Sequence, residues 1–245
     1  MGKCRLCAKE KDLIKKSHIY PNFVYSDLFD EHGKLRKFDA QEMMKINPRI
    51  SKPASGAYEG NLLCAECDNV KISQLENYVA ELLNGKDKKV SCDVKNVRDG
   101  TEIIEVKNLK YVEFKNFVLS LLFRADICSF PEFKEVSLGP YHEKIRKIVY
   151  ENLTTEDFNY QINVFKLSVN SEFKTIIGQP IKSKIGTETV YSILMKGYMI
   201  VVSIKPNSAS EKIKDIRLKS DGSMGIPVIP KKNEEKIILS YFGVI

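Results

Sequence analysis

Apolar residues recur at three- and four-residue steps in three stretches, the spacing that puts side chains on one face of an α-helix. The first stretch follows Cys67 and ends near Asn84-Gly85, and its apolar positions are Ile72, Leu75, Val79, Leu82 and Leu83. The strongest helical pattern covers residues 109–128, with apolar positions Val112, Phe117, Val118, Leu121, Leu122 and Ala125. A third helix is predicted from Pro140 to about residue 152, because proline fits the first turn of a helix.

Strand patterns fill much of the rest of the chain. Alternating apolar residues predict a hairpin over residues 88–107 that turns at Asp99-Gly100. Further strands are predicted at 161–169, 174–177, 189–195, 198–204 and 236–242. The breaks at Lys196-Gly197 and at residues 206–208 suit antiparallel neighbours. The fold class is therefore α+β, with helices at about 109–152 and antiparallel strands at about 158–242.

The pattern changes near residue 86, which divides the chain into an N-terminal module of residues 1–86 and an α+β domain of residues 87–245. Before Cys67 the module has little periodicity, apart from a short helix predicted within residues 20–29 and a Pro- and Gly-rich loop at 45–60. So small a unit buries too little apolar surface to fold alone, and a bound metal would supply the missing stability.

Composition describes an ordinary soluble globular protein, with 43% hydrophobic and 29% charged residues among 245. No apolar run reaches the roughly 18 residues that span a bilayer, so no membrane partner is expected. The start Met1-Gly2-Lys3-Cys4 lacks the apolar segment of a signal peptide, which predicts a cytoplasmic location. The net charge of +7 permits a nucleic-acid partner, although lysines spread over a solvated surface give the same count.

Four cysteines carry the clearest chemical signal. Cys4 and Cys7 form one Cys-x-x-Cys pair, and Cys64 and Cys67 form another. Two such pairs supply the four thiolates of a tetrahedral structural Zn²⁺ site. Paired disulfides or a redox motif would use the same residues, but the expected reducing compartment and the two pairs together favour zinc. The remaining cysteines, Cys92 and Cys128, have no partner spacing and are predicted to be small buried hydrophobic residues.

His18 lies between the two cysteine pairs, in the segment Ser17-His18-Ile19-Tyr20-Pro21. A neutral imidazole could take a proton from a water molecule beside a phosphate, and a divalent ion could polarise the phosphoryl oxygen. Asp68 follows the second cysteine pair at the start of a predicted helix. It could bind such an ion, or it could cap the backbone N–H groups of that helix.

These motifs together resemble the zinc-bearing HNH endonucleases, also called ββα-metal or treble-clef nucleases. The resemblance covers about the first 75 residues and implies a treble-clef module packed on the α+β body. It implies structural zinc on Cys4, Cys7, Cys64 and Cys67, and His18 as the general base. Asp68 and Asn69 would bind a catalytic Mg²⁺ or another divalent ion, and Asn61 would stand near the central asparagine of the family.

One position departs from the family pattern. Ser17 stands where the residue before the histidine is commonly a metal-binding acid. Asp68 could keep the charge of the site, since many members have a neutral residue there; loss of metal-dependent cleavage is the alternative. Another carboxylate that approached His18 and Asp68 in space, such as Glu59, would favour the nuclease.

Several other polar residues lie near these motifs. The cluster Lys34, Arg36 and Lys37 could meet DNA phosphates, although such clusters usually face water. Arg124 and Asp126 could bind a ligand, face the N-terminal module or form an ion pair on the helix surface. The other two histidines, His32 and His142, are expected to be solvated surface residues.

The sequence thus predicts a metal-dependent HNH-like endonuclease that hydrolyses DNA phosphodiester bonds, and a role in bacterial defence fits this resemblance. The alternative is a non-catalytic zinc-scaffolded protein that binds nucleic acid or another protein. RNA remains open as a substrate beside DNA. A protein partner or a second copy of the chain could bind the C-terminal body.

Overall fold

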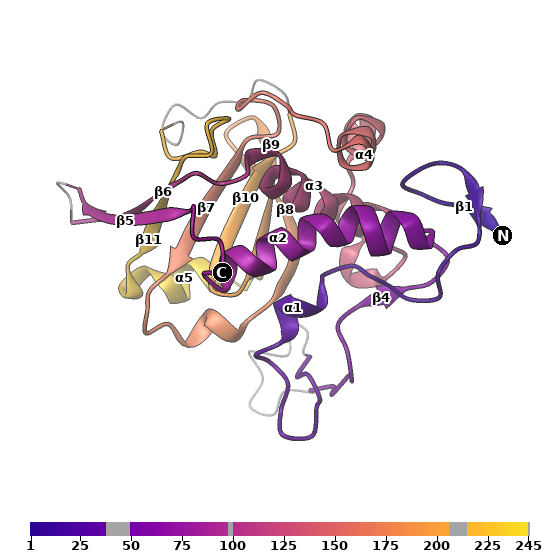
Figure 1. Ribbon diagram of the computed structural model, residues 1–245. Coiled ribbons are helices and arrows are strands. Elements are labelled where there is room, and N and C mark those ends of the chain that lie inside the picture. The colour runs from indigo at the N-terminus through magenta and orange to yellow at the C-terminus, as the bar shows by residue number, and fades with distance from the viewer. Residues whose placement is uncertain (38–49, 98–99, 206–214, 245) are drawn as a thin grey trace.

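The computed structural model describes residues 1–37, 50–97, 100–205 and 215–244. Its centre is a seven-stranded sheet in the order β5-β6-β11-β7-β10-β9-β8, with the helices and the N-terminal segments arranged around it (Figure 1). The strands of this sheet are β5 (Ser91–Asn96), β6 (Glu102–Lys107), β7 (Ile162–Leu167), β8 (Gly178–Ile185), β9 (Glu188–Met195), β10 (Tyr198–Ser203) and β11 (Met224–Ile229). The mixed α+β class is confirmed.

Side chains alternate between the two faces of the sheet, as a strand period of two residues requires. On β9, Tyr191 and Ile193 join the buried cluster under the long helix α3 (Tyr111–Ile127), whereas Val190 and Leu194 join a second cluster. The second cluster is covered by α5 (Lys231–Tyr241). Each face of the sheet is therefore packed against a helix.

Helix α3 is buried around almost its whole circumference, and even its polar residues Lys115, Asn116, Ser120 and Arg124 are buried. The sheet covers one side of α3, while α2 (Ser73–Leu83) and α4 (His142–Glu151) pack on its other sides. The three helices predicted around residues 68–83, 109–128 and 140–152 are confirmed. The first of them begins as a π-helical turn, η2 (Cys67–Ile72).

The N-terminal segments form only short pieces of regular structure. They are β1 (Gly2–Lys3), β2 (Glu10–Lys11), β3 (Ser17–His18), α1 (Asn22–Tyr25) and β4 (Tyr58–Glu59). Strand β1 pairs with β2, and β3 pairs antiparallel with β4. Part of the loop predicted at 45–60 lies outside the described residues, as do Asp99 of the predicted turn and the predicted break at 206–208.

One buried cluster runs from Cys4 in the N-terminal segments to Ile226 in β11. Polar contacts add to it, because the Tyr20 hydroxyl donates a hydrogen bond to the Gly178 carbonyl oxygen over 3.0 Å. Residues on both sides of the predicted boundary at 86 therefore share one hydrophobic core.

Two strand predictions are wrong. Residues 236–241 belong to helix α5 and Phe242 is its C-terminal cap, because Glu234, Ile238 and Tyr241 are buried at helical spacing after Pro230. The first half of the predicted strand 174–177 belongs to a short 3-10 helix, η5 (Glu172–Thr175), and the second half has no regular structure. The N-terminal cap of η5 is the hydroxyl of Ser171, which accepts a hydrogen bond from the backbone N–H of Phe173. Two further short 3-10 helices are η3 (Pro131–Phe133) and η4 (Gly139–Tyr141).

The purely antiparallel arrangement is also wrong at one place. Strand β11 was not predicted from the sequence, and it pairs in parallel with β7. The chain between these strands is long enough to pass through β8, β9 and β10 before it returns, so the crossover that a parallel pair needs is available.

Cys92 is exposed rather than buried, because β5 is an edge strand whose six residues all face solvent. Cys128 is half-buried. Among the described residues, none of the helices combines the length and apolar character that crossing a bilayer requires.

The close approach of Gly222 to Leu109 can be tested by mutation. Gly222 has φ +77°, and an added Cβ would lie 2.2 Å from the Leu109 carbonyl oxygen. We expect Gly222→Ala to lower the free energy of unfolding by about 3 kcal/mol or more in chemical denaturation. Gly186 has φ +62° with open space around it, so Gly186→Ala should cost only about 1 kcal/mol. Equal losses would contradict the packing at Gly222.

Candidate functional site

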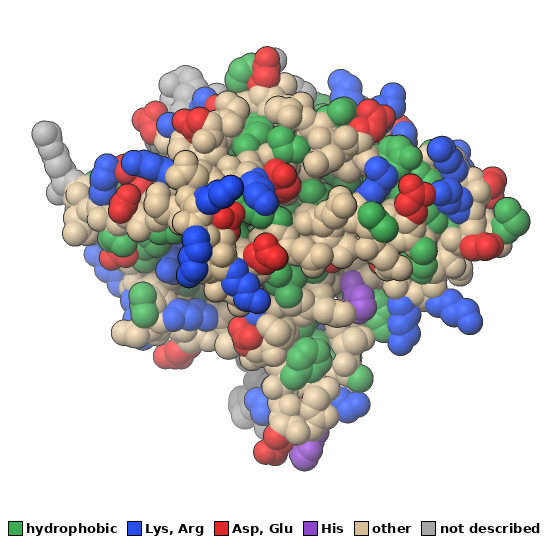
Figure 2. Space-filling model, viewed as in Figure 1, with side chains coloured by type: hydrophobic (Ala, Val, Ile, Leu, Met, Phe, Trp, Pro, Cys, Tyr) green, Lys and Arg blue, Asp and Glu red, His purple; other side chains and the backbone are tan. Residues whose placement is uncertain are grey.

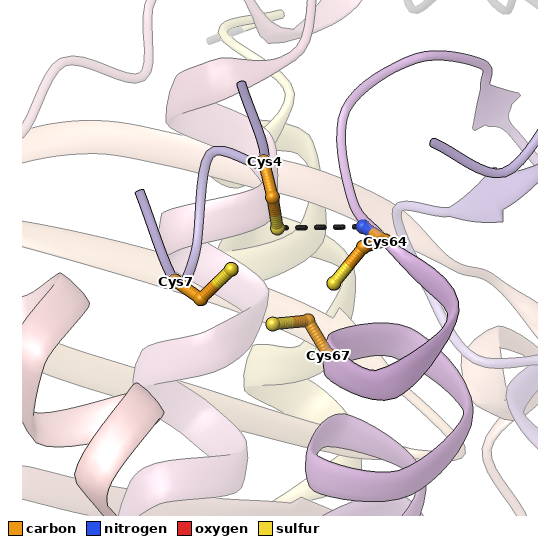
Figure 3. A group of neighbouring side chains, drawn as sticks. All are labelled: Cys4, Cys7, Cys64 and Cys67. Atoms are coloured by element: carbon orange, nitrogen blue, oxygen red, sulfur yellow. Dashed lines mark hydrogen bonds between the residues drawn. The ribbon is translucent and has the colours of Figure 1, made fainter. Parts of the chain in front are cut away.

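The four cysteines predicted to bind zinc lie together. Their sulfur atoms are all within 4.8 Å of one another, and all four residues are buried. Cys4 and Cys7 come from the turn between β1 and β2, Cys64 follows β4, and Cys67 opens η2. Figure 3 shows the four side chains pointing toward a common centre.

Backbone hydrogen bonds hold the two cysteine-bearing turns against each other. The N–H of Arg5 donates to the Leu62 carbonyl oxygen over 2.9 Å, and the N–H of Cys64 donates to the Cys4 sulfur over 3.3 Å. Ala8 has φ +60°, and its N–H donates to the Cys4 carbonyl oxygen over 2.9 Å, which closes the Cys4–Cys7 turn. The sulfur atoms are thus positioned by backbone contacts that the loops themselves make.

The donor set fits a metal ion such as zinc. Four sulfurs at about 2.3 Å from a tetrahedral Zn²⁺ lie about 3.8 Å apart, within the spread of this cluster. A hydrogen bond from the Cys67 thiol, aided by backbone N–H groups, lowers the pKa of Cys4. The same contact and burial raise the pKa of Cys67. Crowded thiols that stabilise one thiolate are a suitable binding set for a soft divalent ion.

His18 lies on β3, opposite Tyr58 of β4, and is half-buried. The rings of His18 and Tyr58 meet edge to face, with centroids 5.9 Å apart. Lys16, which is exposed, holds its Nζ 4.9 Å from the centroid of the same Tyr58 ring. An imidazole and an ammonium group therefore flank one tyrosine at the end of the β3–β4 pair.

Ser17 and Asp68 are joined directly. The Ser17 hydroxyl donates a 2.6 Å hydrogen bond to Asp68 Oδ1, and Ser17 is only 1% exposed. Asp68 is the second residue of η2, and no side chain caps that end of the helix, so its predicted capping role is wrong. The structure instead brings the carboxylate to the residue that precedes His18.

A second carboxylate, Glu76, was missed in the sequence analysis. Arg124 Nη1 donates to Glu76 Oε1 over 2.6 Å and to the His18 carbonyl oxygen over 2.9 Å. Arg124 is 2% exposed, and among the described residues its Nη2 has no hydrogen-bond partner. Arg124 thus faces the N-terminal module rather than the helix surface. The short sequence spacing between Arg124 and Asp126 gave no indication that Arg124 pairs with Glu76.

The charges around His18 act in opposite directions on its pKa. Burial lowers the pKa of His18 below its usual value and is the largest influence; the carboxylates of Asp68 and Glu76 oppose it, and the cations Arg124 and Lys16 add to it. The net result is a lowered pKa of His18, which favours the neutral imidazole, the form that accepts a proton. The charges of Asp68 and Glu76 thus both act on His18.

Other predicted residues lie apart or have different partners. Asn61 and Asn69 are exposed, and Asn61 has φ +61° in the turn before Cys64. The Glu59 carboxylate accepts hydrogen bonds from the N–H and hydroxyl of Ser129 over 2.7 and 2.8 Å. Lys37 forms a 2.6 Å ion pair with Glu132, which leaves Arg36 exposed and Lys34 partly exposed beside it.

The two remaining histidines differ from each other. His32 is exposed, as expected. His142 is only 32% exposed at its side chain, and its Nδ1 lies 2.5 Å from Asp126 Oδ2. Asp126 also accepts a 3.0 Å hydrogen bond from the N–H of Leu138, so this pair fastens the loop between α3 and α4.

Comparison of the chain with protein-family models, with curated proteins and with solved structures gives no match. The residues of the chain itself are therefore the basis for its chemistry. Two groups stand out among the described residues, the four-cysteine cluster and the set formed by Ser17, His18, Asp68 and Glu76.

The metal site leads to a direct prediction. We expect one zinc ion per chain by elemental analysis, and loss of that ion in Cys67→Ser because three sulfurs remain. The variant should lose about 3 kcal/mol or more of stability, which lowers the melting temperature by about 10 °C. Cys92→Ser is the matched control, since Cys92 is exposed on β5. Full zinc content in Cys67→Ser would contradict the assignment.

The surroundings of His18 can be measured by NMR titration of its ring without added divalent ions. Asp68→Asn removes a charge that raises the pKa of His18, so this pKa should fall further. Lys16→Gln removes a charge that lowers it, so the pKa should rise. Asp12→Asn changes an exposed carboxylate and should leave it unchanged. No shift in either of the first two variants would mean that His18 does not lie between these groups.

Proposed function

We propose that this protein is a metal-dependent, HNH-like endonuclease that hydrolyses DNA phosphodiester bonds, with His18 as the general base. The observation that carries the proposal is geometric: Asp68 accepts a hydrogen bond from Ser17, the residue before His18, and Arg124 joins the His18 carbonyl oxygen to Glu76. A structural metal site needs none of these residues. Two carboxylates of the helix that follows the cysteine cluster are thus linked to the His18 segment, and this is the reason to propose catalysis.

The order of elements supports the family resemblance. Strands β3 and β4 form an antiparallel pair, and the helix that starts at Cys67 follows them. This order of two strands and a helix agrees with the ββα name of the family that the chain resembles, and Asp68 directly follows the last cysteine, where the resemblance implies a residue of the metal site. We therefore propose a treble-clef module in residues 1–86, with zinc in a structural role.

Each residue of the site would have its own role in the reaction. His18 takes a proton from the attacking water, which its lowered pKa permits at neutral pH. The hydrogen bond from Ser17 fixes one oxygen of Asp68; the carboxylate as a whole offers the oxygen ligand that a hard ion such as Mg²⁺ prefers. Such an ion, when bound, would stabilise the charge that develops on the phosphate.

Asp68 thus takes the part that the acid before the histidine plays in the family. Ser17 contributes a hydroxyl rather than a charge, and the two residues are in contact. Lys16 stands beside His18 and is exposed, so it could contact the phosphate backbone of the substrate. Figure 2 shows basic side chains interspersed with acidic ones over the visible face.

A non-catalytic zinc-scaffolded protein that binds nucleic acid or a protein partner is the second candidate. The buried contacts of Arg124 favour it, because they fasten β3 and α2 to α3 through the His18 carbonyl oxygen and Glu76. Glu76 and the backbone of His18 then serve packing, and Asp68 serves only to satisfy the Ser17 hydroxyl.

Plasmid nicking by the purified protein with Mg²⁺, Mn²⁺ or Ni²⁺ separates these candidates. His18→Ala should lower the rate by about 10²–10⁴-fold, the usual contribution of a general base, while zinc content stays unchanged. His32→Ala is the matched control, since His32 is exposed. A structured RNA tested in parallel would show whether the substrate is DNA.

Two results would contradict the nuclease. Equal cleavage by His18→Ala and the unaltered protein would remove His18 from the mechanism. Absence of cleavage with all three ions, together with DNA binding that survives in His18→Ala, would establish the scaffold instead.

A further inference from the structure

A cleft of about 260 Å³ lies where α2, the start of α3 and the end of α4 meet. Its apolar floor contains Leu75 and Val149, which are 3% and 2% exposed. Tyr78 and Tyr150 also line it. The cleft has no part in the site around His18, and none of the motifs singled out in the sequence accounts for it.

Two lysines stand at this cleft with their charges positioned by aromatic rings. Lys71 Nζ lies 4.6 Å from the centroid of the Tyr150 ring, and Lys110 Nζ lies 5.1 Å from that of Tyr78. A cation–π contact holds an ammonium group in place without neutralising it. Within the described part of the chain, neither lysine forms an ion pair with a carboxylate.

The ring of Tyr78 is held in place by burial and a hydrogen bond. Tyr78 is 5% exposed, and its hydroxyl accepts a 2.8 Å hydrogen bond from the N–H of Lys110. This bond ties the start of α3 to α2 and sets the position from which the Lys110 side chain reaches back over the ring. Tyr150 lies near the end of α4, whose last turns also carry Val149. Three helices therefore build most of the cleft, together with Lys110 directly before α3 and Asn152 directly after α4.

The remaining lining is polar and suited to a sugar or a base. Gln74, Glu113 and Asn152 contribute two amides and one carboxylate. Amides donate and accept hydrogen bonds, and a carboxylate accepts them from hydroxyl or amino groups. The lining contains two positively charged lysines and one negatively charged glutamate. Its net positive charge favours an anionic ligand.

We propose that this cleft binds a nucleoside phosphate, with Lys71 and Lys110 on the phosphate and the base against the apolar floor and the tyrosines. Ligand pockets for drug-sized molecules begin at about 300 Å³, so the cleft suits one nucleotide rather than a larger ligand. The proposal does not depend on nuclease activity. It requires only a phosphate, a planar ring and hydrogen-bonding groups in one small molecule.

The nucleotide could be free or could belong to a nucleic-acid strand. Lys71 lies three residues after Asp68 in the same helical turn η2. A strand with one nucleotide in the cleft would thus run along the helix that carries Asp68. A free nucleotide would occupy the cleft alone, and its affinity would then be independent of strand length.

Isothermal titration calorimetry of the full-length protein tests the proposal with two kinds of ligand. One is the four nucleoside 5′-monophosphates, each beside the same nucleoside without phosphate, and the other is a single-stranded oligodeoxynucleotide. The double variant Lys71→Gln, Lys110→Gln should weaken binding of at least one of these ligands about tenfold or more. For a strand, the slope of log K against log salt should shrink by about 1.4, since each neutralised phosphate contributes about 0.7.

Lys144→Gln, Lys147→Gln is the matched control, because both residues are exposed on α4 outside the cleft and the variant loses the same charge. Its affinity should stay within about twofold of that of the unaltered protein. Equal weakening in both double variants would mean diffuse electrostatic binding and would overturn the proposal. No binding of nucleotides or strand at millimolar concentration, or equal binding of nucleosides without phosphate, would overturn it as well.

Discussion

The four-cysteine cluster is the constraint on which the N-terminal part of the molecule depends. The strands β1 to β4 are two residues long each, and a two-stranded pair of that length is not stable by itself. The cluster joins a turn at residues 4–7 to the start of a helix at Cys67, across about 60 residues of chain. Closing so long a loop costs conformational entropy, and a metal held by four sulfurs would offset that cost and keep β3 against β4.

Arg124 makes the second connection on which the site depends. A buried guanidinium group needs partners, since an isolated charge in the interior is strongly unfavourable. Glu76 and the His18 carbonyl oxygen supply them from two different segments. The position of His18 relative to the helix is therefore set by the core of the α+β body as well as by the cysteines. The two parts of the chain predicted as separate domains meet at this site.

Much of the fold follows from local patterns that the sequence displays. The helices at Ser73–Leu83 and Tyr111–Ile127 and the pair β9–β10 have periodic apolar residues, and the cysteine spacing led directly to the observed cluster. Strand β11 is six residues long and contains Pro227. Because proline is rare inside strands, the sequence pattern did not predict a strand there. Helix α5 has Ile237 and Ile238 side by side, and such a short apolar run fits a strand or a helix equally well.

The candidate site was harder to predict, because its decisive contacts join residues far apart in the chain. In the sequence, Glu76 has the pattern of an exposed acid on a helix. Its ion pair with Arg124, which lies 48 residues later, is visible only in the structure. The π-helical turn η2 adds a second reason. Asp68 and Glu76 are eight residues apart. In an α-helix, this separation corresponds to two full turns plus a further rotation of about 80° around the helix axis, which would place the two residues on different faces.

The wider turn of a π-helix, with hydrogen bonds from i to i+5, reduces this overshoot over residues 67–72 and brings Asp68 and Glu76 toward one face. Lys71, Leu75 and Tyr78 are then left on a neighbouring face, where the cleft lies. One helix can thus present Cys67 to the cysteine cluster, Asp68 to Ser17, Glu76 to Arg124, and a lysine with a tyrosine to the cleft. Such a division of faces cannot be derived from an α-helical period alone, because it depends on the local winding of the first six residues.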